Sequence, residues 1–306
     1  MTADLPHNVD EYIKQKHYRL VNSVVVYKDN NLILERYYNN RNETSRNNIK
    51  SIWKSIVSIC IGICLDKGYI KSLGTPVADY LEVFKQNIHP YHKLITISDL
   101  LTMSSGIYWN GGIHYHCPML QQLFHSNNWL THIADVAVTE FPGSKHVYKE
   151  WDVILLSALI NKASDMTTYD FCSQFLYKPL GIQSGEWGLS PCGIHYTVID
   201  GQEERSDLTA QELAKIGLLF LNNGEWNNKQ IVSGDYIKQA ITPSPQDKNY
   251  GFLWWLFDGG YACRGFGGQE VNVVPEENLV AVIQATPTSQ SKRYGDIFTN
   301  VIRRGV

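Results

Sequence analysis

The sequence predicts an α+β fold: strands from both chain ends form one antiparallel sheet, flanked by helices, with a large inserted helical lobe. Two predicted strands, residues 21–27 and 32–38, lie on either side of the polar turn 28–31; the first is rich in valine and the second in leucine, isoleucine and tyrosine. Short aromatic and β-branched runs return within residues 251–285, separated by breaks that contain glycine or proline. The middle of the chain instead carries apolar segments of helical length. Strands at both ends with helices between them fit one sheet with an inserted lobe.

The length of 306 residues suits one large unit made of two interleaved lobes. We expect the sheet lobe at about residues 18–70 and 248–306, and the helical lobe at about residues 71–247. Residues 1–17 are polar and are expected to wrap the surface. With 43% hydrophobic and 19% charged residues, the composition is that of a globular protein and argues against disorder.

Charge and hydropathy argue against several classes of partner. The net charge is −3, and no basic stripe or polybasic patch predicts nucleic acid or an anionic membrane as a partner. The longest apolar run, Ile56 to Leu65, is about half as long as a bilayer span requires. The first residues lack the basic and apolar regions of a signal peptide, so we expect a cytoplasmic protein. The sequence leaves the oligomeric state open.

The most distinctive predicted helix covers residues 51–67. Ser51 and Lys54 lie in its first turn and share a face, because residues three apart are neighbours on a helix. The residues that follow are apolar nearly all round, which is typical of a buried helix. Gly68 is expected to end it, since glycine adopts the left-handed conformation without penalty. A hydroxyl and an amine therefore lie on a buried helix, beside the positive end of its dipole.

The remaining helices are predicted from apolar periodicity, capping residues and stop signals. Thr96 is the expected N-cap of one of them, with Asp99 where a capping box has Glu or Gln. The loop 107–118 is rich in glycine, histidine and aromatic residues and is suited to lining a cleft. The expected helices cover residues 75–81, 96–103, 152–163, 169–177, 208–221, 230–240 and, closing the chain, 294–304.

Ser51 and Lys54 are candidates for a nucleophile and its base. A serine hydroxyl becomes a good nucleophile only when a neighbouring base takes its proton. A lysine can be that base if burial or another cation lowers its pKa, and the start of a buried helix favours such a decrease. Tyr148 is a candidate to share the proton, although a buried structural tyrosine would also explain it. The Ser-x-x-Lys spacing alone is weak evidence, because it recurs at Ser289–Lys292 in a polar run that we expect to be idle.

The sequence predicts no metal ion or cofactor. Cys60 and Cys64 lie one helical turn apart and could be two metal ligands, but buried core thiols are favoured. His114 and His116 could form half of a site, but no further ligand lies nearby at metal-site spacing. The six cysteines are scattered without a Cys-x-x-Cys pair, which agrees with a cytoplasmic location.

Several motifs occur in a characteristic order along the chain. They are Ser51–Lys54 with its apolar helix, Thr96–Gly106, Pro142-Gly143 followed by Tyr148, Pro179–Ile182 and Gly265–Gln269. In this order and spacing the chain resembles the serine β-lactamase and penicillin-binding-protein superfamily, in its class C-like branch of esterases, D-aminopeptidases and nylon-oligomer hydrolases. The resemblance covers nearly the whole chain and implies a β-lactamase/transpeptidase-like fold.

The resemblance implies roles for the first two motifs. Ser51 matches the acylated nucleophile and Lys54 its partner, and Tyr148 matches the tyrosine that passes a proton toward the leaving group. The family has Asn two residues after this tyrosine, where this chain has Glu150. An acid thus replaces an amide that would hydrogen-bond a substrate amide. Glu150 is either a substrate contact or a solvated acid at a helix start, where the dipole favours it.

The third motif is similar to the family's Lys-Thr-Gly or His-x-Gly strand. Phe266, Gly267 and Gly268 match it, and the backbone N–H of Gln269 would form the oxyanion hole together with that of the nucleophile. The uncharged Phe266 stands where Lys or His is usual, and that cation helps to hold the carboxylate of β-lactams. Its absence argues for ester or other amide substrates. Arg264 is close in sequence and could supply a charge, but it occupies a different strand position.

Aromatic residues suggest a cleft beside these motifs. Tyr108, Trp109 and Trp151 are expected to contact substrate, whereas core packing explains Trp254 and Trp255 at least as well as a cleft does.

We therefore expect a cytoplasmic serine hydrolase that cleaves an ester or small amide through an acyl-enzyme, without a cofactor and with weak or no β-lactamase activity. Two alternatives remain open. The same machinery could pass the acyl group to an amine or alcohol if the cleft excludes water. The chain could also be a non-catalytic ligand-binding or scaffold relative, which is disfavoured because Ser51, Lys54 and Tyr148 are all retained.

Overall fold

The computed structural model describes residues 4–86, 89–112, 117–185, 187–197, 206–288 and 292–306. Within them, the main sheet has six strands and all of its neighbouring pairs are antiparallel. The strand order is β2 (Asn31–Tyr37), β1 (Val21–Lys28), β12 (Leu279–Ala285), β11 (Gln269–Val274), β10 (Gly260–Gly265) and β9 (Trp255–Phe257). Strands from both chain ends are therefore neighbours, and the predicted α+β fold is confirmed.

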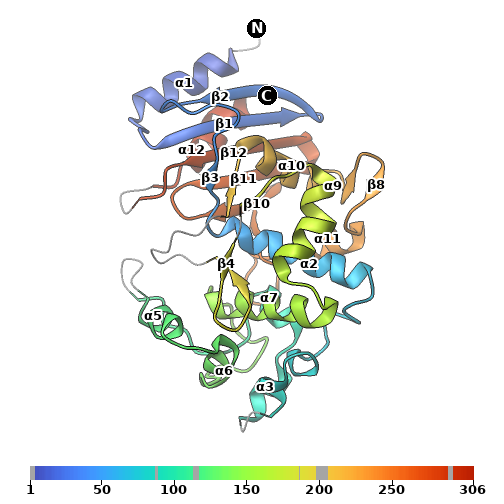
Figure 1. Ribbon diagram of the computed structural model, residues 1–306. Helices are drawn as coiled ribbons and strands as arrows, with labels where there is room; N and C mark the ends of the chain where they lie inside the picture. Colours follow the sequence, from blue (N-terminus) through green and yellow to red (C-terminus); the bar gives the residue numbers. More distant parts are fainter. Residues whose placement is uncertain (1–3, 87–88, 113–116, 186, 198–205, 289–291) are drawn as a thin grey trace.

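Helices fill the chain between β2 and β9 and also flank the sheet at both chain ends (Figure 1). The α-helices are α1 (Leu5–Gln15), α2 (Ile52–Asp66), α3 (Glu82–Lys85), α4 (Ile97–Leu101), α5 (Pro118–Phe124), α6 (Trp129–Ala134), α7 (Glu150–Ser164), α8 (Thr168–Cys172), α9 (Lys178–Leu180), α10 (Ala210–Leu221), α11 (Gly234–Ala240), α12 (Gly295–Ile297) and α13 (Arg303–Gly305).

Shorter elements complete the described chain. The 3-10 and π-helical turns are η1 (Val77–Asp79), η2 (Pro90–Leu94), η3 (Ser173–Tyr177), η4 (Pro275–Glu277) and η5 (Phe298–Ile302). Two-residue strands pair as β3 (Asn47–Asn48) with β6 (Asp207–Leu208), β4 (Gly188–Leu189) with β5 (His195–Tyr196), and β7 (Glu225–Trp226) with β8 (Lys229–Gln230).

Both faces of the main sheet are buried, against different groups of helices. Along β1, Val25 packs in the core on the side of α10 and α2, whereas Val24 and Val26 pack on the side of α1 and the C-terminal helices. Figure 1 shows α1 and α12 on the sheet side that faces away from the helical lobe. Because successive strand residues point to opposite faces, a strand covered on both sides needs an apolar residue at each position. The run of three valines meets that need.

The helix α2 lies at the centre of the molecule, between the sheet and α7 (Figure 1). Its residues from Ile52 to Cys64 are all buried. Gly62 allows close packing, since a Cβ there would lie 2.5 Å from the ring of Tyr236. Gly68, with φ of 75°, follows the helix end as predicted. Within the described ranges, no helix is both long enough and apolar enough to span a bilayer.

Residues 1–17 were expected to wrap the surface, and this expectation missed a helix within their described part, residues 4–17. Residues 5–15 form α1, whose buried face consists of Leu5, Val9 and Ile13. The Asp4 side chain caps this helix by accepting a hydrogen bond from the backbone N–H of His7. The four-residue spacing of the apolar side chains and an aspartate before the first turn were the available signals.

Two other predictions are confirmed in different degrees. Thr96 and Asp99 form the predicted capping box, with both reciprocal hydrogen bonds present. The strand predicted over residues 251–257 is shorter, because β9 begins only at Trp255. Leu253 has φ of 63°, which lies outside the extended region and interrupts the strand.

Gly217→Ala tests the contact between α10 and the sheet. A Cβ at Gly217 would lie 2.6 Å from Val280 Cγ1 and 2.8 Å from Val271 Cγ1. We expect the free energy of unfolding to fall by about 1–2 kcal/mol, since overpacking outweighs the gain in helix propensity. Gly234→Ala in α11 is the matched control, because its nearest atom would be 3.5 Å away and stability should not fall. Urea unfolding measures both, and a Gly217→Ala variant as stable as wild type would contradict the close approach.

Candidate active site

A turn with unusual backbone geometry positions Ser51 at the start of α2. Ser51 is the N-cap residue, but its side chain makes no capping hydrogen bond. The preceding residue, Lys50, has φ of 51°, and its N–H donates to Asn48 Oδ1 at 2.9 Å. A left-handed lysine is uncommon and such conformations cluster at functional sites. The Ser51 hydroxyl therefore makes no hydrogen bond that caps the helix and can interact with neighbouring side chains.

Lys54 points toward Ser51 from the same helical turn, with 3.3 Å between Lys54 Nζ and Ser51 Oγ. Its closer partner is Glu150, whose Oε2 lies 2.6 Å from Nζ, and both side chains are only 2% exposed. Burial lowers the pKa of Lys54, but its interactions with Glu150 and Tyr148 outweigh burial, so the net pKa is raised. The sequence-based expectation that the pKa of Lys54 is lowered is therefore wrong, because the Lys54 ammonium is paired with the Glu150 carboxylate.

Glu150 begins α7, where the helix dipole favours an acid. The sequence left two alternatives for Glu150, a substrate contact and a solvated acid. Neither is right, since its side chain is buried against Lys54, away from solvent and from the pocket described below. The neighbouring Lys149 has a separate set of buried partners, with its Nζ 3.2 Å from Ser105 Oγ and 3.9 Å from Asp152 Oδ2. This second cluster anchors the backbone beside Glu150.

Tyr148 completes the group around Ser51, the predicted nucleophile. Lys54 Nζ lies 5.4 Å from the centre of its ring, which stacks on Trp255 at 5.7 Å and meets Tyr250 edge-on at 6.4 Å. Burial raises the pKa of Tyr148; Lys54 and a hydrogen bond with Ser51 oppose this, and the net pKa is raised. The hydroxyl therefore keeps its proton at neutral pH and can donate it.

The turn between β10 and β11 approaches Ser51 from the sheet. Gly265 lies against the chain before α2, because a Cβ there would be 2.2 Å from the carbonyl oxygen of Ile49. Gly267 and Gly268 have φ of 83° and 88°, a region that glycine enters without steric cost. Gln269 pairs with Gly265 across the turn, and its side chain is fully buried. The part of its backbone N–H in an oxyanion hole stays a prediction.

A pocket of about 390 Å³ opens beside these groups. It brings together Ser51, aromatic rings, the glycine-rich turn and charged side chains. Its lining residues are Ser51, Tyr148, Trp255, Arg264, Gly265, Phe266, Gly267, Gly268, Glu270, Lys292 and Arg293. Residues predicted from three distant motifs thus border one cavity, with Lys54 and Glu150 buried behind it.

The pocket carries positive charge even though Phe266 is uncharged. Arg264, Lys292 and Arg293 all line it. The sequence does not predict Arg293 here, and it predicts Lys292 only as part of the idle Ser-x-x-Lys repeat, whose residues 289–291 lie outside the described residues. Basic residues after the glycine-rich turn and before the last helix were the signal available.

The Arg264 side chain lies beside an aromatic ring in this pocket. Its guanidinium carbon lies 6.0 Å from the centre of the Trp255 ring. Among the described residues, Arg264 Nε has no hydrogen-bond partner. Burial and repulsion from Arg293 lower the pKa of Arg264, while attraction to Glu270 opposes them. An anion that entered the pocket would relieve this excess of positive charge.

The aromatic residues of the predicted cleft lie elsewhere. Trp151 is wholly buried, donates its Nε1–H to the Tyr108 carbonyl at 3.2 Å, and packs edge-on against Trp109 at 4.9 Å. Its predicted substrate contact is wrong, because the side chain is closed off in the core. Tyr108 and Trp109 line a separate hollow of about 180 Å³. Trp254 stacks on Phe220 in the core at 4.1 Å.

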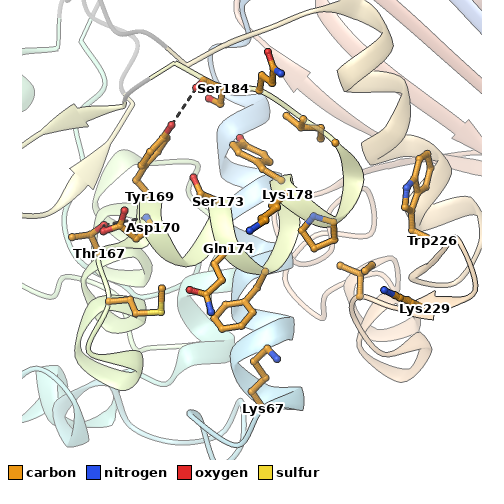
Figure 2. Close-up of a pocket in the computed structure, with 18 of the residues that line it drawn as sticks. Lys67, Thr167, Tyr169, Asp170, Ser173, Gln174, Lys178, Ser184, Trp226 and Lys229 are labelled. Atoms are coloured by element: carbon orange, nitrogen blue, oxygen red, sulfur yellow. Dashed lines mark hydrogen bonds between the residues drawn. The ribbon is translucent and has the colours of Figure 1, made fainter.

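A larger pocket, of about 1560 Å³, lies away from this chemistry. Figure 2 shows it beside α8, η3 and α9, with Lys67, Lys178 and Trp226 around it. Lys67 follows the far end of α2, about 24 Å along the helix axis from Ser51. The meeting of the Ser51 hydroxyl, the Lys54 amine and the Tyr148 phenol, rather than pocket size, identifies the candidate site.

The candidate metal ligands do not form a site within the described ranges. There, no group of three or more His, Cys, Asp or Glu side chains is placed to hold a metal ion. Cys60 and Cys64 are buried free thiols, as predicted, and burial raises the pKa of both. His114 and His116 lie outside the described residues.

Lys54→Met tests the buried ion pair through stability. The change removes the cation but keeps most of the side-chain volume, so Glu150 stays buried without its counter-charge. We expect the free energy of unfolding to fall by about 3–5 kcal/mol at pH 8. The loss should be smaller at pH 5. There the Glu150 carboxylate, which has no counter-charge in the variant, can take up a proton, and this uptake stabilises the folded variant as pH falls.

The matched control is Lys145→Met, which breaks an exposed pair with Glu140 whose members are 59% and 42% exposed. It should cost about 1 kcal/mol or less at either pH. Urea unfolding at the two pH values measures both variants. An equal loss for Lys54→Met at pH 5 and pH 8 would contradict an ionised buried pair.

Comparison with known proteins places this geometry in context. The Beta-lactamase family model matches residues 8–299. An uncharacterized protein of Alkalihalophilus pseudofirmus is 23% identical, in a match that covers 85% of this chain and 82% of that protein.

Solved structures of similar fold include a penicillin binding protein from Bacillus halodurans, with a TM-score of 0.75 and 18% identity, covering 97% of this chain and 99% of that one. A family VIII carboxylesterase has a TM-score of 0.75 and 13% identity, covering 100% of this chain and 99% of that one. These two likenesses concern the fold. Because the family match spans nearly the whole sequence, this chain belongs to the beta-lactamase family.

Proposed function

We propose that this protein is a serine hydrolase that cleaves an ester or small amide bond through an acyl-enzyme on Ser51. One observation carries the proposal: Ser51 and Tyr148, which come from separate parts of the chain, line one pocket, and Lys54 lies buried directly behind Ser51. Lys54 Nζ lies 3.3 Å from Ser51 Oγ, and Tyr148 lines the pocket with Ser51. Membership of the beta-lactamase family and the likeness to a carboxylesterase fold support this reaction class.

In the proposed reaction, Ser51 Oγ bonds to the substrate's carbonyl carbon and releases its proton toward Lys54. The backbone N–H groups of Ser51 and Gln269 stabilise the negative carbonyl oxygen, each by about 3 kcal/mol. The bond to the leaving group breaks as the Tyr148 hydroxyl donates a proton to it. Water then attacks the acyl-enzyme in the same way and releases the acid.

The pocket suits a small substrate with an apolar part and an acidic group. Its volume of about 390 Å³ is near the lower end for ligand sites, and Trp255 and Phe266 supply apolar walls. Arg264, Lys292 and Arg293 supply positive charge that attracts a carboxylate. The uncharged position 266 therefore does not argue against carboxylate-bearing substrates, and weak or absent β-lactamase activity stays a prediction.

Transfer of the acyl group to an amine or alcohol remains the alternative reaction, because one acyl-enzyme serves both acceptors. A non-catalytic ligand-binding role is disfavoured by the close approach of Lys54 to Ser51. The absence of nucleic-acid and membrane partners, and a cytoplasmic location, remain predictions from the sequence.

Covalent labelling tests the nucleophile. Wild-type protein treated with a fluorophosphonate should gain one adduct, and Ser51→Ala should gain none, as measured by intact mass. Ser55→Ala is the matched control from the same helix, since its hydroxyl is buried and donates to the Leu253 carbonyl at 2.7 Å. This control should still be labelled. An unlabelled wild type, or a labelled Ser51→Ala variant, would overturn the proposed nucleophile.

A further inference from the structure

Acylation needs a group that finally accepts the Ser51 proton. Lys54 is the nearest basic side chain, but in the pair with Glu150 it is an ammonium, which has no lone pair to accept a proton. Beyond Lys54, the next atom able to accept one is Glu150 Oε2, at 2.6 Å from Lys54 Nζ. The two short steps, 3.3 Å and 2.6 Å, form a continuous path from the hydroxyl to a carboxylate.

We propose that Glu150 is the terminal proton acceptor of acylation and acts through Lys54. This inference rests on the proposed acyl-enzyme at Ser51. One proton passes from Lys54 Nζ to Glu150 Oε2, so an N–H bond breaks and an O–H bond forms. The lone pair left on Nζ takes the hydroxyl proton as Ser51 Oγ bonds to the carbonyl carbon. Lys54 is again an ammonium, Glu150 is a neutral acid, and the negative charge lies on the carbonyl oxygen.

The same path returns the proton when the leaving group departs. The bond between the carbonyl carbon and the leaving group breaks, and the leaving group takes a proton from the Tyr148 hydroxyl. Lys54 restores that proton to Tyr148, and Glu150 returns its own to Lys54. The net result is transfer of one proton from Ser51 to the leaving group, with each side chain back in its first state. Glu150 is thus a positioning and proton-storing residue, since it does not touch the substrate.

Burial lowers the free-energy cost of moving a proton from Lys54 to Glu150. In water an amine outcompetes a carboxylate for a proton by about six orders of magnitude. Inside the protein both charges lose their hydration, which favours the neutral amine and acid relative to the ion pair. Lys54 and Glu150 are each 2% exposed. The amide of the family's Asn could not accept the proton, so the acid is what makes the relay possible in this chain.

Other ionisable groups surround the pair. Tyr148 and Tyr250 face it, and burial raises the pKa of both, so they stay neutral through the range tested below. Lys149, just before α7, and Asp152, on α7, form their own cluster with Ser105. These groups are common to wild type and variants, so a change in the pH profile reports the pair.

The wild-type pH profile is the first test. We measure kcat/KM for p-nitrophenyl acetate, followed at the isosbestic wavelength of the released phenol. The relay needs Lys54 and Glu150 to share one titratable proton, as they do when Lys54 is an ammonium and Glu150 a carboxylate. We therefore expect kcat/KM to stay constant between about pH 7 and pH 9. A lone lysine base with a raised pKa would instead make the rate climb about tenfold per pH unit over that range. Such a climb would overturn the relay.

Glu150→Gln is the second test, because it keeps the shape but cannot store a proton. Its kcat/KM should fall by about 100-fold or more at pH 6 and recover as pH rises, since Lys54 must then lose a proton to the solvent. Glu140→Gln, which removes the acid of an exposed lysine pair, should match wild type at each pH. A Glu150→Gln variant with an unshifted profile would contradict the relay, even if its rate were lower.

The two proposals fail in different ways. If wild-type Ser51 is not labelled by a fluorophosphonate, the acyl-enzyme itself is wrong. If Ser51 is labelled but the wild-type rate climbs steadily with pH, only the relay is wrong. Should Glu150→Gln fail to fold, the wild-type profile alone decides, because it needs no variant.

Discussion

The buried ion pair between Lys54 and Glu150 joins two long apolar helices, α2 and α7, at the centre of the molecule. Its members are 96 residues apart in the sequence, and each charge is tolerated inside because the other one is there. The pair therefore fixes where α7 begins relative to α2. Because Tyr148 lies just before α7, the same contact sets the phenol beside Ser51. The stability of this region and the proposed chemistry thus depend on one interaction, the Lys54–Glu150 ion pair.

Helical spacing is enough to predict that Ser51 and Lys54 share a face, and the structure places their reactive atoms 3.3 Å apart. The partner of Lys54 could not be predicted in this way. Contact with Glu150 depends on how α7 packs against α2, and no local pattern encodes that packing. The same holds for Arg293, which reaches the pocket only because the chain after β12 returns to the glycine-rich turn. The resemblance to a known family identified the motifs and their order along the chain. The contact of Glu150 with Lys54 and the position of Arg293 at the pocket became visible only in the structure.

For the fold, prediction succeeded where single residues decide the outcome. Gly68 follows the end of α2, and Thr96 caps α4, because these choices depend on backbone geometry within one turn. The helix α1 was missed although Leu5, Val9 and Ile13 repeat with helical spacing. Its buried face is only a narrow stripe in a polar segment, and it is stabilised by the sheet rather than by local preference.

The most direct measurement of the central claim locates the acyl group during turnover. Wild-type protein would be mixed with p-nitrophenyl acetate, quenched with acid within milliseconds, digested and mapped by tandem mass spectrometry. If Ser51 is the nucleophile at this pocket, the acetyl group will be found on the Ser51 hydroxyl, and this species will appear before free acetate. An acetyl group on another side chain, or steady turnover without any acetylated Ser51, would contradict the proposed active site.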